Sequence, residues 1–281
     1  MLFYLLIALL LVAGLVYVTG TLLAKPVPVE IGAGPDDLPV ESISLPSESG
    51  SQLAGWFIPG KADHGAIVMA HGVRSNRLAL LERARFLQAA GYSVLLFDFQ
   101  AHGESPGEHI TFGHLEARDM NAMVAYMQQR LPDEKLAVLG ISLGGASTLL
   151  SNAPANANAL ILEAVYSDLE RAVGNRIAVR LGSLGYKLAP LLLWQTRMRL
   201  GFDAASLSPV ERAKLVQVPA FVIGGAEDRR TLVKETRLIH ANLAGDKQLW
   251  ILDGAGHQDF HLYQTAEYER RVLAFLADKL R

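Results

Sequence analysis

Leu136-Ala137-Val138-Leu139 leads directly into Gly140-Ile141-Ser142-Leu143-Gly144, and the residues that follow favour a helix. The apolar run predicts a short buried strand. Glycines on either side of Ser142 permit a tight turn from strand to helix, which would leave the serine hydroxyl exposed at the end of the strand. We therefore expect a sheet in which Ser142 stands at the carboxyl end of one strand.

Short apolar runs alternate with helical segments along most of the chain. The predicted buried strands, besides the one before Ser142, are 66–70, 94–97, 159–162, 220–223 and 248–252. The predicted helices are 75–90, 115–129, 143–151, 231–243 and 263–280. This alternation indicates an α/β fold with a mostly parallel central sheet and helices on both faces. Two earlier runs, 43–45 and 52–58, flank a Pro-Ser-Glu-Ser-Gly turn and predict an antiparallel hairpin at the sheet edge.

One connection, residues 165–216, is too long for a simple crossover between two strands. It holds the apolar stretch Leu188–Leu193 followed by Trp194, with a helix break or start expected at Pro190. A helical cap over a binding site is one interpretation, in which this connection lines or covers an apolar acyl site. A crossover helix with a packed excursion is the other.

The first 24 residues form a separate apolar segment. No charged residue lies between Leu2 and Ala24, and a helix of this length spans roughly 34 Å, which exceeds the roughly 30 Å of a hydrocarbon core. The start lacks the positive charge of a signal peptide, and Leu22-Leu23-Ala24 is a poor cleavage site. We expect a retained single-pass membrane anchor, with a cleaved signal peptide as the alternative. The side on which the body lies stays open, because Lys25 is the one nearby Lys or Arg.

Four prolines and two glycines between 25 and 39 predict an extended linker. We expect one domain over 40–281 that folds without the preceding residues. The whole chain has 26 Lys and Arg against 28 Asp and Glu, a formal net charge of −2, which speaks against a nucleic-acid partner. The absence of cysteine excludes a disulfide framework and a thiolate nucleophile. Oligomeric state stays open.

A serine hydroxyl needs a base to remove its proton and a third group to orient that base. Asp228 follows the predicted strand 220–223 through a glycine loop, and His257 follows the predicted strand 248–252. Both therefore lie beyond strand ends, where a parallel sheet assembles its site. We expect Ser142 as nucleophile, His257 as base and Asp228 as its orienting acid, with Glu227 and Glu163 as the competing carboxylates.

Acyl transfer also needs N–H donors for an oxyanion. The N–H of Leu143 follows the nucleophile, and the loop His71-Gly72-Val73 after strand 66–70 offers the N–H of Val73. His71 itself is expected to be structural. Spacings of 7 and 5 among His102, His109 and His114 match no compact zinc signature, so we expect no metal and no cofactor.

The chain resembles serine hydrolases of the α/β-hydrolase superfamily over about 41–281, and within it bacterial esterases and serine-aminopeptidase-like members. The matching motifs are His71-Gly72, Asp98-Phe-Gln-Ala-His-Gly-Glu-Ser105, Gly140–Gly144, Gly225-Ala-Glu-Asp228 and Gly256-His257. The second motif usually reads Asp-x-Arg-Gly-His-Gly-x-Ser, so Gln100-Ala101 is a departure near the site and outside the triad. The order Ser142, Asp228, His257 is the one usual in this superfamily.

The resemblance implies hydrolysis of a carboxylic ester of a small-molecule, apolar acyl substrate through an acyl-enzyme. Thioesters and amides stay open, as do a peptidase and a perhydrolase. The alternative from another class is a membrane-tethered binding module on an inactive hydrolase fold.

Overall fold

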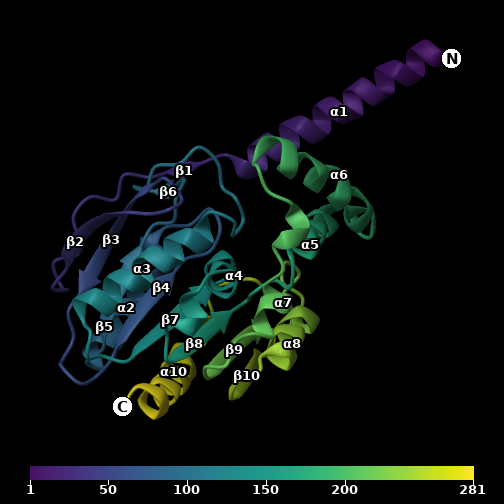
Figure 1. Ribbon diagram of the computed structural model, residues 1–281. Helices are drawn as coiled ribbons and strands as arrows, with labels where there is room; N and C mark the ends of the chain where they lie inside the picture. The colour runs from purple at the N-terminus through teal and green to yellow at the C-terminus, as the bar shows by residue number, and fades with distance from the viewer.

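A sheet of eight strands forms the centre of the molecule, in the order β10-β9-β8-β7-β4-β5-β3-β2. β3 runs antiparallel to both its neighbours, β2 and β5, and the other neighbouring strands pair in parallel. The computed structural model describes the backbone of residues 1–281 and every side chain except those of Leu2, Ala8 and Leu9. The expected mostly parallel sheet with an antiparallel hairpin at one edge is confirmed (Figure 1).

The elements have the following bounds. The strands of the large sheet are β2 (Glu41–Pro46), β3 (Gln52–Ile58), β4 (Ala66–Ala70), β5 (Ser93–Phe97), β7 (Leu136–Ile141), β8 (Ala159–Glu163), β9 (Ala220–Gly225) and β10 (Lys247–Leu252), and a small sheet pairs β1 (Val27–Pro28) with β6 (His102–Gly103). The α-helices are α1 (Leu2–Ala24), α2 (Leu81–Ala89), α3 (Glu116–Arg130), α4 (Leu143–Leu150), α5 (Leu169–Leu181), α6 (Leu184–Arg199), α7 (Pro209–Ala213), α8 (Val233–Asn242), α9 (Phe260–Tyr263) and α10 (Thr265–Leu280). Three 3-10 helices are η1 (Arg77–Leu80), η2 (Ala153–Ala155) and η3 (Ala204–Ser206).

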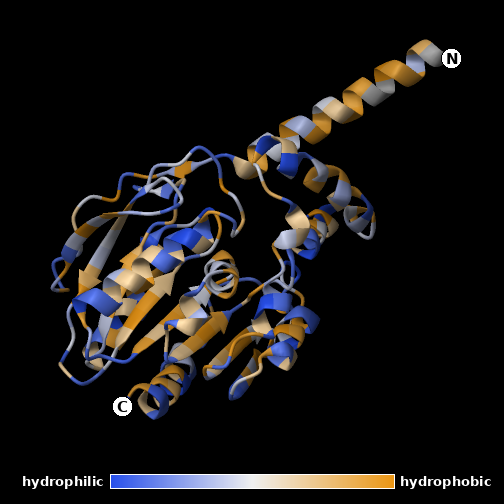
Figure 2. Ribbon diagram, in the orientation of Figure 1, coloured by the Kyte–Doolittle hydropathy of each residue, from blue (hydrophilic) through white to orange (hydrophobic). Residues whose placement is uncertain are grey.

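Each face of the sheet is covered by a hydrophobic core. Because successive side chains of a strand point to opposite faces, one strand contributes to both cores. In β4, Val68 packs in one core with Met120 of α3, whereas Met69 packs in a second core with Leu87 of α2 and Phe275 of α10. Strands covered on both sides have continuous apolar sequences, which is why the central strands in Figure 2 are almost uniformly apolar.

The long connection between β8 and β9 holds two helices packed against each other, α5 and α6. α6 continues through Pro190, so the helix break or start expected there is wrong. Trp194 is 71% exposed. The apolar stretch 188–193 predicted helical structure, but the sequence did not show which of its side chains face inward.

α1 projects from the body and meets it near its C-terminal end, beside α6 (Figure 1). Gln195 of α6 donates to the carbonyl of Val16 (3.0 Å), and Arg199 donates to the carbonyl of Tyr17 (3.1 Å). Gly20 lies so close to Gln195 that a Cβ atom at this position would clash with its side chain. α1 is thus docked on α6, and it is long and apolar enough to cross a membrane, a property that a signal sequence shares.

The segment expected as a linker, 25–39, is packed along the body rather than free. Its strand β1 pairs with β6, and the Glu104 carboxylate accepts hydrogen bonds from the N–H groups of Ile31 (2.9 Å) and Gly32 (2.8 Å). Leu38 packs against the second core. The prolines correctly indicated an extended backbone, but they gave no sign that its N–H groups have partners in a distant loop.

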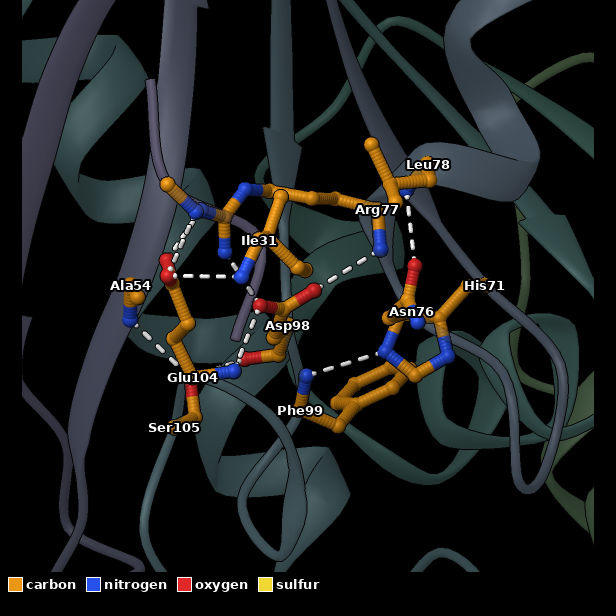
Figure 3. A network of polar contacts seen from close by, with 11 residues as sticks. Ile31, Ala54, His71, Asn76, Arg77, Leu78, Asp98, Phe99, Glu104 and Ser105 are labelled. Carbon is orange, nitrogen blue, oxygen red and sulfur yellow. Dashed lines mark hydrogen bonds and ion pairs between the residues drawn. The ribbon is translucent and has the colours of Figure 1, made fainter. Parts of the chain in front are cut away.

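A buried ion pair joins the chain after β4 to the chain after β5 (Figure 3). The Arg77 guanidinium contacts the Asp98 carboxylate, and the two side chains are 2% and 0% exposed. Asp98 also accepts from the backbone N–H groups of Arg77 (2.7 Å) and Glu104 (3.0 Å). Burial raises the pKa of Asp98, whereas these two N–H groups and the guanidinium lower it. The pair therefore ties the two loops to each other.

His71 is fully buried in the first of these loops. Its Nε2 accepts from the N–H of Phe99 (3.1 Å), which leaves Nδ1 to donate to the carbonyl of Gly72 (2.8 Å). Burial, together with the neighbouring His102, lowers the pKa of His71 to about 3. The ring is neutral and fully bonded, as a structural role requires.

Removal of residues 1–39 should lower the melting temperature more than removal of residues 1–24, because the longer deletion also removes the two backbone hydrogen bonds to Glu104 and the packing of Leu38 against the second core. A difference of 1 kcal/mol corresponds to about 2 to 4 °C in a domain of this size. Calorimetric melting of the two truncated proteins measures the difference. Equal melting temperatures would show that the segment adds nothing to stability.

His71 should make the protein less stable in acid. Its folded pKa of about 3 lies below the unfolded value of about 6.5, so the folded state binds fewer protons, and stability present above pH 6.5 is lost as the pH falls toward 3. The full effect is on the order of 5 kcal/mol. Denaturant unfolding between pH 7 and 4 should show a shallower decline for His71→Gln than for the wild type. The exposed control, His109→Gln, should keep the wild-type slope, and an unchanged slope in His71→Gln would contradict the assignment.

Candidate active site

Ser142 occupies the turn between β7 and α4 with φ 51° and ψ −107°, a strained backbone for a residue with a side chain. Its N–H donates to the carbonyl of Glu163 in the adjacent strand (2.7 Å). A Cβ at Gly140 would clash with the backbone of Gly145, and one at Gly144 with the backbone of Ala70. The two glycines of the motif are therefore required by the close approach of α4 to the sheet.

His257 and Asp228 come together at the carboxyl ends of β9 and β10. These strands are aligned so that Gly225 pairs with Leu252, which places the loops that follow them side by side. His257 Nδ1 lies 2.7 Å from Asp228 Oδ2. The other oxygen of Asp228 accepts from the N–H groups of Arg230 (2.7 Å) and Thr231 (2.8 Å), so the carboxylate is buried and fixed in orientation.

The competing carboxylates lie elsewhere. Glu227 is exposed to solvent. Glu163 is buried on another side of the sheet end from His257, where it forms an ion pair with Arg83 (3.0 Å) and accepts from the hydroxyl of Tyr268. Of the three acids considered from the sequence, the structure brings Asp228 to His257.

The two predicted oxyanion donors flank Ser142. Ala70 at the end of β4 is paired with Gly140 at the end of β7, so the loop after β4 meets the turn that holds Ser142. A Cβ at Gly72 would lie 3.8 Å from that of Ser142. Leu143 is the first residue of α4, whose initial N–H groups lack intrahelical acceptors. Val73 and Leu143 both line the cavity that Ser142 lines.

This cavity has a volume of about 540 Å³, which is typical of a small-molecule site. Ser142 and His257 line it together. Its apolar lining comes from the core domain, from the connection that holds α5 and α6, and from α1: Leu23, Ala24, Val73, Phe112, Leu143, Leu169, Ala172, Val173, Ile177, Val179, Leu181, Leu192, Leu193 and Leu200. Trp194, the residue that the sequence suggested for this role, is not among the lining residues. α6 contributes other side chains instead, among them Leu192 and Leu193.

Gln100 and Ala101, the two residues that depart from the usual second motif, are accommodated by the loop that holds them. The Gln100 amide donates to the carbonyl of His109 and to Glu116 (both 2.8 Å), which ties down the following loop. Ala101 has φ 60°, a conformation that favours the glycine usual at this position. Neither residue lines the cavity.

Two groups of cavity residues were missed from the sequence. One is the C-terminal end of α1, where Thr19, Gly20, Leu23 and Ala24 form part of the wall. The other is a set of five arginines: Arg74, Arg176, Arg180, Arg199 and Arg230. A spacing of four residues places Arg176 and Arg180 on one face of a helix, but nothing in the sequence links this face to Ser142.

Comparison with known proteins identifies the family to which the fold belongs. The sequence profile of the family described as serine aminopeptidase, S33, matches residues 61–209, which include Ser142. The uncharacterized protein YqkD of Bacillus subtilis is 23% identical over 236 residues, 83% of this chain and 77% of that protein. Human monoglyceride lipase is 28% identical over 123 residues, 42% of this chain and 41% of the lipase.

Among solved structures, the Pyrococcus furiosus esterase Pf2001 has a TM-score of 0.74 at 24% identity, covering 92% of this chain and all of that chain. This likeness supports the fold of the chain as described above. The chain belongs to the serine aminopeptidase S33 family, within the α/β-hydrolase superfamily.

Proposed function

We propose that this protein is a serine hydrolase that cleaves carboxylic esters by means of Ser142, His257 and Asp228. The observation that carries the proposal is the 2.7 Å contact between His257 Nδ1 and Asp228 Oδ2, with His257 and Ser142 lining one cavity. This bond makes Nδ1 the protonated nitrogen, so Nε2 is free to accept a proton from a serine hydroxyl.

In the first half of the reaction, Ser142 Oγ attacks the ester carbonyl carbon and its proton passes to His257 Nε2. The N–H groups of Val73 and Leu143 donate to the oxyanion that forms. Collapse of this intermediate breaks the bond to the alcohol oxygen, and His257 returns the proton to that oxygen. The products of this half are the free alcohol and an acyl group on Ser142.

In the second half, His257 takes a proton from water as the water oxygen attacks the acyl carbon. The bond to Ser142 Oγ then breaks, Oγ regains the proton, and the carboxylic acid leaves. Asp228 stays ionised and stabilises the imidazolium in both halves. One ester and one water thus yield one acid and one alcohol, with no cofactor.

The cavity favours an ester with an apolar acyl group over the amino-terminal residue of a peptide. An aminopeptidase must bind the positively charged amino group of its substrate, which calls for a carboxylate. The described residues that line the cavity include no Asp or Glu, and most are apolar. Thioesters satisfy the same requirements as oxygen esters at this cavity.

α1 supports a proposal for location: a single-pass anchor that holds the catalytic domain at a membrane. Its exposed apolar side chains, among them Leu10, Leu11 and Leu15, stand clear of the body and need an apolar environment.

A fluorophosphonate probe should label the wild-type protein and not Ser142→Ala, because the reagent reacts with a serine activated by a base. In-gel fluorescence measures the labelling, and a p-nitrophenyl ester assay should lose activity in parallel. Ser147→Ala, in the helix that follows, serves as the matched control. An unlabelled, folded wild-type protein would favour the binding-module alternative.

Asp228→Asn should lower kcat by about 10⁴, the effect of the same change in a serine protease, because the amide stabilises the wrong tautomer of the histidine. Glu227→Gln should leave kcat near the wild-type value, since this side chain is exposed. Glu163→Gln should lower the melting temperature by weakening the contact with Arg83, with a smaller effect on kcat. If Glu163→Gln is the crippled variant and Asp228→Asn is active, the acid is misassigned.

A further inference from the structure

The cavity of the candidate active site contains an unusual concentration of positive charge. Five of its lining residues are arginines, whereas none of the described lining residues is acidic. The rest of the lining is mostly apolar. A substrate that fills this cavity therefore meets cations as well as an apolar wall.

Two of these arginines are occupied in docking α1. Arg199 donates to the carbonyl of Tyr17 (3.1 Å) and to the hydroxyl of Thr21 (2.7 Å). Arg74 donates to the carbonyls of Leu22 and Lys25 (both 3.4 Å), at the end of α1 where the helix dipole is negative. These hydrogen bonds to α1 account for Arg199 and Arg74 without a ligand.

The other three arginines have no such hydrogen bonds to α1. The side chains of Arg176, Arg180 and Arg230 are exposed to solvent, and their guanidinium groups form no hydrogen bond and no ion pair with the residues that the structure describes. Partial desolvation lowers the pKa of Arg176, and the nearby cations Arg230 and Arg74 lower it further. The nearby carboxylate of Asp228 raises the pKa of Arg176. This carboxylate, however, is already hydrogen-bonded to His257 and to two backbone N–H groups.

Grouped guanidinium groups without partners are suited to an anion, because their planar forks bind phosphate or carboxylate through paired, charge-assisted hydrogen bonds. Arg230 lies two residues from Asp228, so the anion would be held close to the catalytic groups. The acyl chain would extend along the apolar lining, which includes Leu23 of α1 and Leu193 of α6.

We propose that the substrate is an amphiphilic ester with one acyl chain and an anionic headgroup, and that Arg176 and Arg230 bind the anion while the cap and the C-terminal turn of α1 enclose the chain. This inference rests on the proposed ester hydrolase function and adds the substrate class. It also gives α1 a role beyond anchoring, since residues of this helix form part of the substrate cavity.

The test uses the full-length protein in neutral detergent micelles and three esters that share a lauroyl chain: 1-lauroylglycerol, 1-lauroylglycerol 3-phosphate and 3-O-lauroylglycerate. Lauric acid release gives kcat/KM for each. We expect an anionic ester to exceed the neutral one by at least about tenfold, the usual worth of hydrogen bonds to a charged group. The phosphate and carboxylate arms show which headgroup the arginines prefer.

Arg176→Gln and Arg230→Gln should each reduce this anionic-to-neutral ratio about tenfold, and Arg176→Lys should restore part of it by retaining the charge. Arg197→Gln, an exposed arginine of α6 outside the cavity, is the matched control and should keep the wild-type ratio. Melting temperatures establish that each variant is folded. Equal kcat/KM for neutral and anionic esters, or a ratio that survives both glutamine substitutions, would overturn the inference.

A binding measurement separates this inference from the proposed function. Full-length Ser142→Ala, which cannot turn over substrate, is titrated calorimetrically with 1-lauroylglycerol 3-phosphate and with 1-lauroylglycerol. Tighter binding of the phosphate, lost in Ser142→Ala/Arg176→Gln, supports the anion site even if the wild type hydrolyses neither ester. Equal binding of the two refutes it even if the wild type is an active esterase.

Discussion

The geometry of the candidate site depends on the buried ion pair between Arg77 and Asp98. It links the chain after β4, which carries the predicted oxyanion donor Val73, to the chain after β5. Breaking such a pair by removing one partner typically costs about 3 to 5 kcal/mol, because the remaining charge is buried without compensation. Glu104 extends the network from this pair to the backbone at Ile31, so the segment before the sheet is held by the same contacts as the site (Figure 3).

α1 packs directly against the rest of the protein at α6. α1 could have been joined to the catalytic domain by a free tether, and its sequence would look the same. Instead, Gln195 and Arg199 bind its backbone carbonyls, and its last turns form part of the cavity wall. If α1 spans a bilayer, the cavity lies where the helix leaves the membrane, a location that suits the amphiphilic ester proposed above.

Secondary structure was predictable where the local sequence pattern fitted one kind of element. The central strands are covered on both faces, so their uninterrupted apolar runs identified them, and the glycines around Ser142 marked the turn between β7 and α4. Errors arose where packing overrode a local rule. α6 continues through Pro190, because a single lost backbone hydrogen bond can be outweighed by the packing of α6 on α5. Trp194 is exposed, because the inward face of α6 is set by its contacts and not by which of its residues is largest.

By itself, the sequence determined the class of fold, the serine at the strand-to-helix turn, and the carboxylate and histidine in loops after later strands, since motif and chain order record local geometry. Which acid reaches His257 was decided by tertiary structure: strand register brings the loop of Asp228 beside that of His257, while Arg83 and Tyr268 engage Glu163. The same holds for the arginines and α1 residues of the cavity. They lie far apart in the chain, and side chains that share a cavity only through the packing of separate elements leave no common spacing in the sequence.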